Sequence, residues 1–206
     1  MEFGFKKLAC MVLLASAAVA GESGVFVGGE AGIYSSKNSY DSPWQDYSPA
    51  DSGVDSYSWS DRAGEFGFKI GYVFSKNHRG YAGYYKSGTV KDSAEWEASL
   101  SKFLVGYDYT PEIAKTWRGV LGLYGGYAKV DMSVDDLSFS VNGTLFGGKL
   151  GVIYELGEKS EIEMGIKVER VGLKDKQFVE DAIGTSSIAN YTQTNRGIFI
   201  GYNYKF

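Results

Sequence analysis

The sequence ends in the segment "RGIFIGYNYKF", residues 196–206. Large apolar side chains recur at every second position, and polar residues such as Asn203 and Lys205 lie between them. This period of two is typical of a β-strand, because successive side chains of a strand point to opposite faces. The apolar set is Ile198, Ile200, Tyr202, Tyr204 and Phe206.

The apolar face of this last strand must be shielded from water. In a soluble sheet it would pack against a second layer, and another element would usually cover the strand edge. Nothing follows Phe206 in the sequence. We therefore expect that something other than a second protein layer receives this face.

The first twenty residues have the layout of a secretory signal peptide. Lys6 and Lys7 precede the apolar run "LACMVLLASAAVA", and Ala18 and Ala20 supply the small residues of an A-x-A cleavage site. The run is shorter than the roughly 18 to 20 residues that a spanning helix needs, although an N-terminal membrane anchor is the alternative. We expect residues 1–20 to be removed on export, which leaves residues 21–206 as one domain.

The composition narrows the function classes. Cys10 is the only cysteine and lies in the leader, so the exported chain is expected to have no disulfide, thiolate nucleophile or cysteine-bound metal. The formal net charge of −4 argues against a nucleic-acid partner. The 28 Gly and 16 Tyr are an unusually large share of 206 residues. With no later stretch apolar enough for a spanning helix, a closed barrel is the remaining way to cross a membrane.

Eight segments show the alternation expected of membrane-spanning strands. Four carry the prediction most clearly, at residues 25–34, 62–74, 144–156 and 161–170. Three more fit, at residues 101–109, 117–127 and 196–206, whereas in residues 81–90 aromatic side chains occupy both faces and the parity is ambiguous. The pattern predicts an all-β fold, an eight-stranded antiparallel up-and-down transmembrane β-barrel.

The connections between these segments are short on one side and long on the other. The short ones are "SKNHRG", "TPEIAKT" and "GEKS", and the longest of the others covers residues 35–61. This asymmetry is typical of outer-membrane barrels, which have short periplasmic turns and long extracellular loops. Aromatic residues at the periplasmic strand ends, together with Trp117, fit an interfacial girdle.

A soluble, periplasmic lipocalin-like ligand binder is the alternative fold and function. It would show the same alternation with the opposite polarity, its large apolar side chains inside and its charges outside. Alternation alone does not tell which face points inward. The leader, the loop asymmetry and the terminal strand together favour the membrane barrel.

With these features the chain resembles the small eight-stranded outer-membrane β-barrels, the group of the OmpA transmembrane domain and the OmpX and Ail-like proteins. The cleavage site at Ala18 to Ala20, the eight segments and the terminal strand carry the resemblance. It implies location in the outer membrane of a Gram-negative bacterium, contact with outer-membrane lipid and lipopolysaccharide, and a monomer. It also implies that the barrel-assembly machinery reads Ile198, Ile200, Tyr202, Tyr204 and Phe206 as an assembly signal. The peptidoglycan-binding domain of full-length OmpA proteins is expected to be absent.

The inward face of the predicted barrel carries charges of both signs. An eight-stranded interior is just wide enough to be filled by side chains, and unpaired buried charges are costly. We therefore expect a plug of ion pairs; a narrow proton- or ion-conducting path is the alternative. The candidate lumen residues are Glu30, Glu65, Lys69, Lys102, Arg118, Lys149, Glu163, Lys167 and Glu169.

We do not expect an enzyme, although some small outer-membrane barrels modify lipid or cleave peptides. Such a reaction would need a base near the outer leaflet or in the loops. The only histidine, His78, lies in the predicted periplasmic turn "SKNHRG" and is expected to be a solvated turn residue beside Lys76 and Arg79. No catalytic residue, cofactor or metal site is predicted, and "DSGVD" is at most a weak Ca²⁺ candidate.

The loop at residues 35–61 is the remaining candidate for activity, since loops on a rigid scaffold often carry function. It holds five aspartates and several large aromatic residues, which are common in binding surfaces. The alternative is that the loops form only a solvated cap. The resemblance to Ail-like proteins implies adhesion to a host or matrix ligand, or resistance to host defence. The loop candidates are Trp44, Tyr47, Tyr57 and Trp59.

Overall fold

A computed structural model describes residues 24–45, 52–88, 90–91, 97–134, 137–174 and 190–206. Eight long strands form the barrel: β1 (Gly24–Gln45), β2 (Ser52–Ser75), β3 (His78–Ser87), β5 (Glu97–Tyr109), β7 (Trp117–Val134), β8 (Leu137–Glu155), β9 (Ser160–Lys174) and β10 (Asn190–Lys205). Two short strands, β4 (Val90–Lys91) and β6 (Glu112–Ala114), lie beside them. None of the described residues forms a helix that could cross a membrane.

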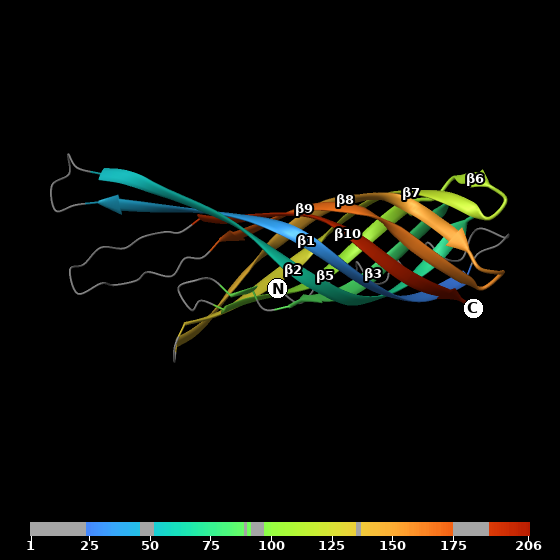
Figure 1. Cartoon of the computed structure of the whole chain (residues 1–206), viewed down its shortest axis with the longest axis horizontal. Coiled ribbons are helices and arrows are strands. Elements are labelled where there is room, and N and C mark those ends of the chain that lie inside the picture. The colour runs from blue at the N-terminus through green and yellow to red at the C-terminus, as the bar shows by residue number, and fades with distance from the viewer. Residues whose placement is uncertain (1–23, 46–51, 89, 92–96, 135–136, 175–189) are drawn as a thin grey trace, which may run out of the picture.

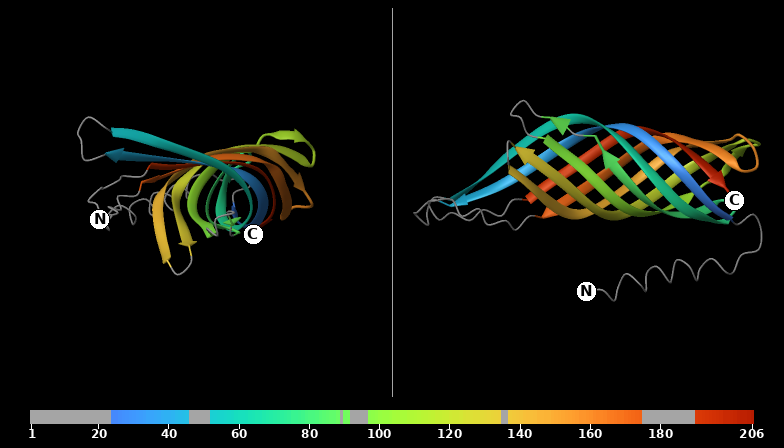
Figure 2. Two further views of the ribbon diagram at one scale, coloured as in Figure 1. Left: turned by 60° about the vertical axis from the view of Figure 1, so that its left-hand side comes forward. Right: turned by 90° about the horizontal axis from the view of Figure 1, so that it is seen from below.

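The sheet closes on itself, as Figures 1 and 2 show. Each long strand pairs antiparallel with its neighbour in sequence, β5 pairs with β7, and β1 pairs with β10 through a register that places Ala31 opposite Ile200. The backbone N–H of Phe206 also donates to the carbonyl oxygen of Val25 at 3.0 Å. The predicted eight-stranded antiparallel barrel is confirmed, and the last strand finds its partner in the first.

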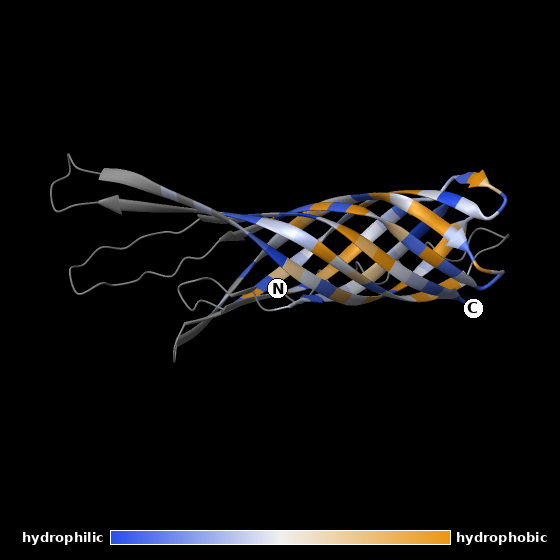
Figure 3. Cartoon of the chain, viewed as in Figure 1, coloured by the Kyte–Doolittle hydropathy of each residue, from blue (hydrophilic) through white to orange (hydrophobic). Residues whose placement is uncertain are grey.

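Side-chain burial shows which face of the barrel points outward. Phe68 is 63 % exposed and Ile70 is 58 % exposed, whereas Lys69 between them is buried. The same alternation recurs around the barrel and gives the ribbon its striped hydropathy in Figure 3. A lipocalin-like barrel would have the opposite polarity. The outward apolar band is what a lipid environment requires.

The ambiguous third segment is resolved by β3. Arg79, Tyr81 and Tyr85 are buried, while Tyr84 points outward and is exposed. The strand spans His78–Ser87, so the prediction that it begins at Tyr81, with His78 and Arg79 in a turn, is wrong. The strand begins earlier because β3 already pairs with β2 and β5 at His78.

The first loop also differs from expectation. Most of the predicted loop at residues 35–61 continues as strand, since β1 and β2 stay paired up to Gln45 opposite Ser52. Figure 1 shows this two-stranded ribbon projecting well beyond the barrel. This ribbon was not predicted from the sequence, because a polar composition rich in Ser and Asp is typical of loops.

Candidate functional site

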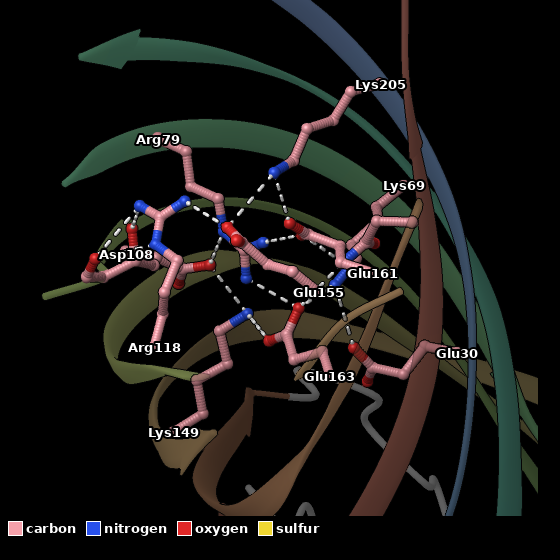
Figure 4. A network of polar contacts seen from close by, with 12 residues as sticks. Glu30, Lys69, Arg79, Asp108, Arg118, Lys149, Glu155, Glu161, Glu163 and Lys205 are labelled. Carbon is pink, nitrogen blue, oxygen red and sulfur yellow. Dashed lines mark hydrogen bonds and ion pairs between the residues drawn. The ribbon is translucent and has the colours of Figure 1, made fainter. Parts of the chain in front are cut away.

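The candidate site is the lumen, where charged side chains from all eight long strands come together. Each candidate lumen residue named from the sequence lies on the inward face and makes a polar contact there. Arg118 and Lys167 are half-buried, and the side chains of the others are buried. Figure 4 shows the part of this network nearer the periplasmic end.

Glu163 of β9 lies where three cations converge and is fully buried, with 0 % exposure. Its carboxylate accepts from Nζ of Lys69 and from Nζ of Lys149, each at 2.8 Å. Arg79 donates to the same carboxylate at 2.6 Å. These contacts join β2, β3, β8 and β9 across the lumen, so the network spans the interior and does not line a single wall.

Arg79 is the main residue that sequence reasoning missed; Asp108, Glu161 and Lys205 were not among its candidates either. Its guanidinium is buried and also donates to Asp108 at 2.9 Å and to Glu161 at 2.6 Å. Asp108 in turn accepts from Nζ of Lys149 at 2.9 Å. Both carboxylates lie on inward positions of their strands, and the same parity rule would have found Arg79 if β3 had been started two residues earlier.

A second cluster lies nearer the extracellular end and is centred on Lys102. Lys102 donates to Glu169 at 2.7 Å and pairs with Glu65. Glu169 also accepts from the hydroxyl of Tyr124 at 3.2 Å and from the amide of Asn195 at 2.8 Å. Each buried carboxylate therefore has a cation beside it, as low dielectric surroundings require.

Lys167 connects the two clusters. It pairs with Glu30, and its Nζ lies 3.9 Å from Glu65. Glu30 lies 3.5 Å from Nζ of Lys69, which belongs to the first cluster. The ion pairs thus form one continuous chain along the barrel axis.

Arg118 closes the periplasmic end. Its guanidinium donates to the carbonyl oxygen of Thr110 at 3.0 Å, to the Thr110 hydroxyl at 2.7 Å and to the carbonyl oxygen of Lys76. Glu155 lies 3.6 Å away, and Lys205 bridges from Glu155 at 4.0 Å to Glu161 at 2.8 Å. These contacts hold the turns after β2 and β5 against the barrel mouth.

Tyrosines and glycines fill the remaining space between the charges. Nζ of Lys149 lies 4.6 Å above the ring of Tyr81, and Nζ of Lys167 lies 4.6 Å above that of Tyr85. A Cβ atom on Gly67 would come within 2.2 Å of the Tyr85 ring. The inward glycine therefore makes room for the large ring, which explains part of the unusual Gly and Tyr content.

A small cavity lies in the extracellular half of the lumen. A cavity of about 20 Å³ lies between Tyr34, Glu65, Lys102, Asn195 and neighbouring residues. This volume holds roughly one water molecule. The amide oxygen of Asn195 has no hydrogen-bond partner among the residues that the structure describes, which suits a bound water.

His78 differs from its prediction as a solvated turn residue. It is the first residue of β3, its Nδ1 shares a hydrogen bond with the hydroxyl of Tyr107, and its ring centroid lies 5.3 Å from that of Tyr109. It therefore belongs to the aromatic girdle. Within the described ranges, no group of three or more His, Cys, Asp or Glu residues is placed to hold a metal ion.

The loop candidates fall outside what the structure describes of side chains. Tyr47 lies outside the described residues, and only the backbone is described for Trp44, Tyr57 and Trp59. On the ribbon, Tyr57 pairs with Tyr40 and Trp59 with Asn38.

The residues of the expected assembly signal lie on the outer face of β10. Ile198, Ile200 and Tyr202 are exposed, and Phe206 is 70 % exposed. The ring of Tyr204 meets that of Phe206 edge-on, with centroids 5.2 Å apart. The terminal residues thus present a continuous apolar stripe on the lipid side of the β1–β10 seam.

The model of the family described as "Outer membrane protein beta-barrel domain" matches residues 7–206, nearly the whole chain. The protein belongs to this family. Its place is therefore the bacterial outer membrane, as predicted from the leader and the strand pattern. None of the curated proteins matches the chain.

Solved structures of outer-membrane barrels share the fold at low sequence identity. Neisserial surface protein A has a TM-score of 0.55 at 11 % identity, over 84 % of this chain and 97 % of that one. OprG from Pseudomonas aeruginosa has a TM-score of 0.53 at 15 % identity, over 89 % and 96 %. The outer membrane protease OmpT from Escherichia coli has a TM-score of 0.52 at 9 % identity, over 89 % and 97 %. These likenesses show the fold alone.

Proposed function

We propose that this outer-membrane protein is a non-enzymatic, non-conducting barrel whose lumen is plugged by its ion pairs and whose biological role is carried by its extracellular end. The convergence of Lys69, Arg79 and Lys149 on the buried Glu163 supports the plug most directly. A solute would have to separate these pairs and leave charges uncompensated in a low-dielectric interior.

The geometry of the barrel supports the same conclusion. Eight strands leave an interior that side chains can fill, and here Tyr81, Tyr85 and Tyr124 occupy it together with the charges. The small cavity beside Tyr34 has room for roughly one water molecule.

Solute entry into proteoliposomes tests the plug. We expect the refolded protein to leave vesicles impermeable to a small sugar such as arabinose, as vesicles without protein are. Swelling at a rate that scales with the amount of barrel would refute the plug and favour the narrow pore.

For the extracellular end we propose an interaction with a host or matrix ligand, either for adhesion or for resistance to host defence. The β1–β2 ribbon supports this proposal, because it carries aromatic residues and aspartates away from the membrane. The choice of ligand class rests on the resemblance to Ail-like proteins, which is an analogy of fold.

Shortening the ribbon tests this role. Deleting residues 42–58 should leave a heat-stable barrel, because the ribbon lies beyond the residues where β2 pairs with β3, and should abolish binding of expressing cells to immobilised matrix proteins. Deleting residues 177–187 from the last extracellular connection is the matched control. Unchanged binding after the first deletion would show that the ribbon is irrelevant.

Catalysis is not part of the proposal. OmpT is a protease, but at 9 % identity only its fold applies to this chain. The only histidine of the sequence is held in the aromatic girdle by Tyr107, at the periplasmic end and away from the extracellular surface.

A further inference from the structure

The projecting β1–β2 ribbon has two faces of different composition. Pairing between β1 and β2 runs over residues 24–45 without a shift of register, so the alternation of the barrel continues along the ribbon. Asn38 is buried on the lumen side, whereas Ser56, Ser58 and Ser60 are exposed on the opposite side. We call the side that continues the lumen wall the inner face of the ribbon, and the opposite side its outer face.

Aromatic residues gather on the inner face. Tyr40 pairs with Tyr57 of β2 on one side and with Tyr191 of β10 on the other, so the register aligns three tyrosines in one row across three strands. Trp59 lies one row nearer the barrel, and Trp44 lies two rows further out. At roughly 7 Å between rows, these aromatic residues are spread over about 20 Å of the ribbon. This length matches about six residues of an extended peptide.

Charged residues are also divided between the two faces. Asp55 and Asp61 occupy inner-face positions, and the aromatic positions of β2 lie between them. Lys37 and Arg62 are on the outer face and are exposed, and Asp41 shares that face. Among the described inner-face positions of β1, β2 and β10 from the row of Asp61 outward, none is a Lys or an Arg. The inner face is therefore aromatic and acidic, whereas the basic residues lie on the outer face.

A face that combines aromatic residues with carboxylates is chemically suited to cations. A Lys ammonium or an Arg guanidinium binds over the face of a Tyr or Trp ring, and a guanidinium also donates in pairs to a carboxylate. An anionic ligand would meet Asp55 and Asp61 with no basic residue of the same face to attract it. A neutral glycan could stack on aromatic rings, but it would gain nothing from the two negative charges. The charge of the inner face thus favours a cationic ligand.

We propose that the inner face of the ribbon binds an extended polypeptide segment rich in Arg and Lys. The order of inner-face residues along β2 supports this ligand, because Trp59 and Tyr57 lie between Asp61 and Asp55. Figure 1 shows that the ribbon carries this face beyond the barrel, where a large partner can approach it. The inference rests on the proposed binding role of the extracellular end, and it gives the ligand of that end a chemical class.

Fluorescence anisotropy with the refolded protein in phosphatidylcholine nanodiscs tests the ligand class. The probe is a labelled peptide of alternating Arg and Gly that is long enough to reach both aspartates. The variant D55N/D61N should bind it about fivefold more weakly, because each exposed ion pair contributes modestly. The variant Y57S/W59S should bind it about tenfold more weakly, through the loss of cation–π contacts. The matched control D41N should bind like the wild type, because Asp41 lies on the outer face.

Three results would overturn the proposal. The first is equal affinity of the wild type and either inner-face variant for the peptide. The second is equal weakening by D41N, which would mean a general effect of negative charge on the ribbon. The third is binding of a neutral oligosaccharide such as cellohexaose in place of the peptide, which would mean a glycan site. An unchanged gel shift on boiling shows that the variants are folded.

The outcome is distinguishable from failure of the proposed function. If cells need residues 42–58 to bind matrix proteins but the purified protein does not bind the peptide, the cationic ligand is refuted and the proposed function stands. If the inner face binds the peptide but the deletion leaves cell binding unchanged, the peptide site stands and the adhesive role of the ribbon is refuted.

Discussion

Among single residues, Glu163 contributes most to the plug, because three cations form ion pairs with its buried carboxylate. Glu163→Gln would leave Lys69, Arg79 and Lys149 partly uncompensated, and loss of one partner of a buried ion pair costs about 3–5 kcal/mol. Lys167→Met should destabilise less, because Lys167 is 15 % exposed. The temperature at which the folded band disappears from unboiled gels should fall in the order wild type, Lys167→Met, Glu163→Gln. Equal temperatures for Glu163→Gln and the wild type would contradict the account.

Glycines give a second prediction at this scale. Gly67→Ala places a methyl group within 2.2 Å of the Tyr85 ring and should destabilise the barrel by about 1–3 kcal/mol through overpacking. Gly29→Ala is the matched control, because its Cβ would meet nothing within 4 Å. Urea unfolding midpoints compare the two. Equal shifts of the midpoint for both substitutions would show that overpacking against Tyr85 is not the cause.

Among the strands, β10 allows an effect on assembly in the membrane to be distinguished from an effect on the stability of the folded barrel. The Phe206 side chain is 70 % exposed, while its backbone N–H donates to Val25. Phe206→Ala should therefore barely change the stability of refolded protein but lower its amount in the outer membrane of expressing cells, as an assembly signal requires. Immunoblots of membrane fractions measure this amount, and equal levels of variant and wild type would count against the signal.

The alternation of side chains along each strand predicted most of the charged residues in the lumen. Once "EIEMGIKVER" is read as a strand, Glu163, Lys167 and Glu169 fall on one face, because β geometry leaves no other choice. Arg79 was missed because aromatic side chains on both faces of its strand hide the parity, and pairing with β2 and β5 sets where the strand begins. Which carboxylate each cation contacts was also beyond the sequence, since it depends on the register around the closed barrel.

For the molecule as a whole, the orientation of the barrel in the outer membrane can be tested with single introduced cysteines. Cys10 lies in the expected leader and is the only cysteine, so an introduced thiol has no competitor in the exported chain. Ser58→Cys on the projecting ribbon should react with an impermeant maleimide on intact cells. Glu158→Cys in the turn between β8 and β9 should react only after permeabilisation. The reverse labelling pattern would show that the barrel has the opposite orientation in the membrane.

Single-channel recording in planar bilayers tests whether the ion pairs close the lumen. The wild type should give no resolved openings at moderate voltage, because the contacts of Glu163 with Lys69, Arg79 and Lys149 join opposite walls of the lumen. Lys167→Met should be equally silent, since it leaves those contacts in place. Well-resolved, reproducible channels from the wild type would contradict the plug and establish a pore.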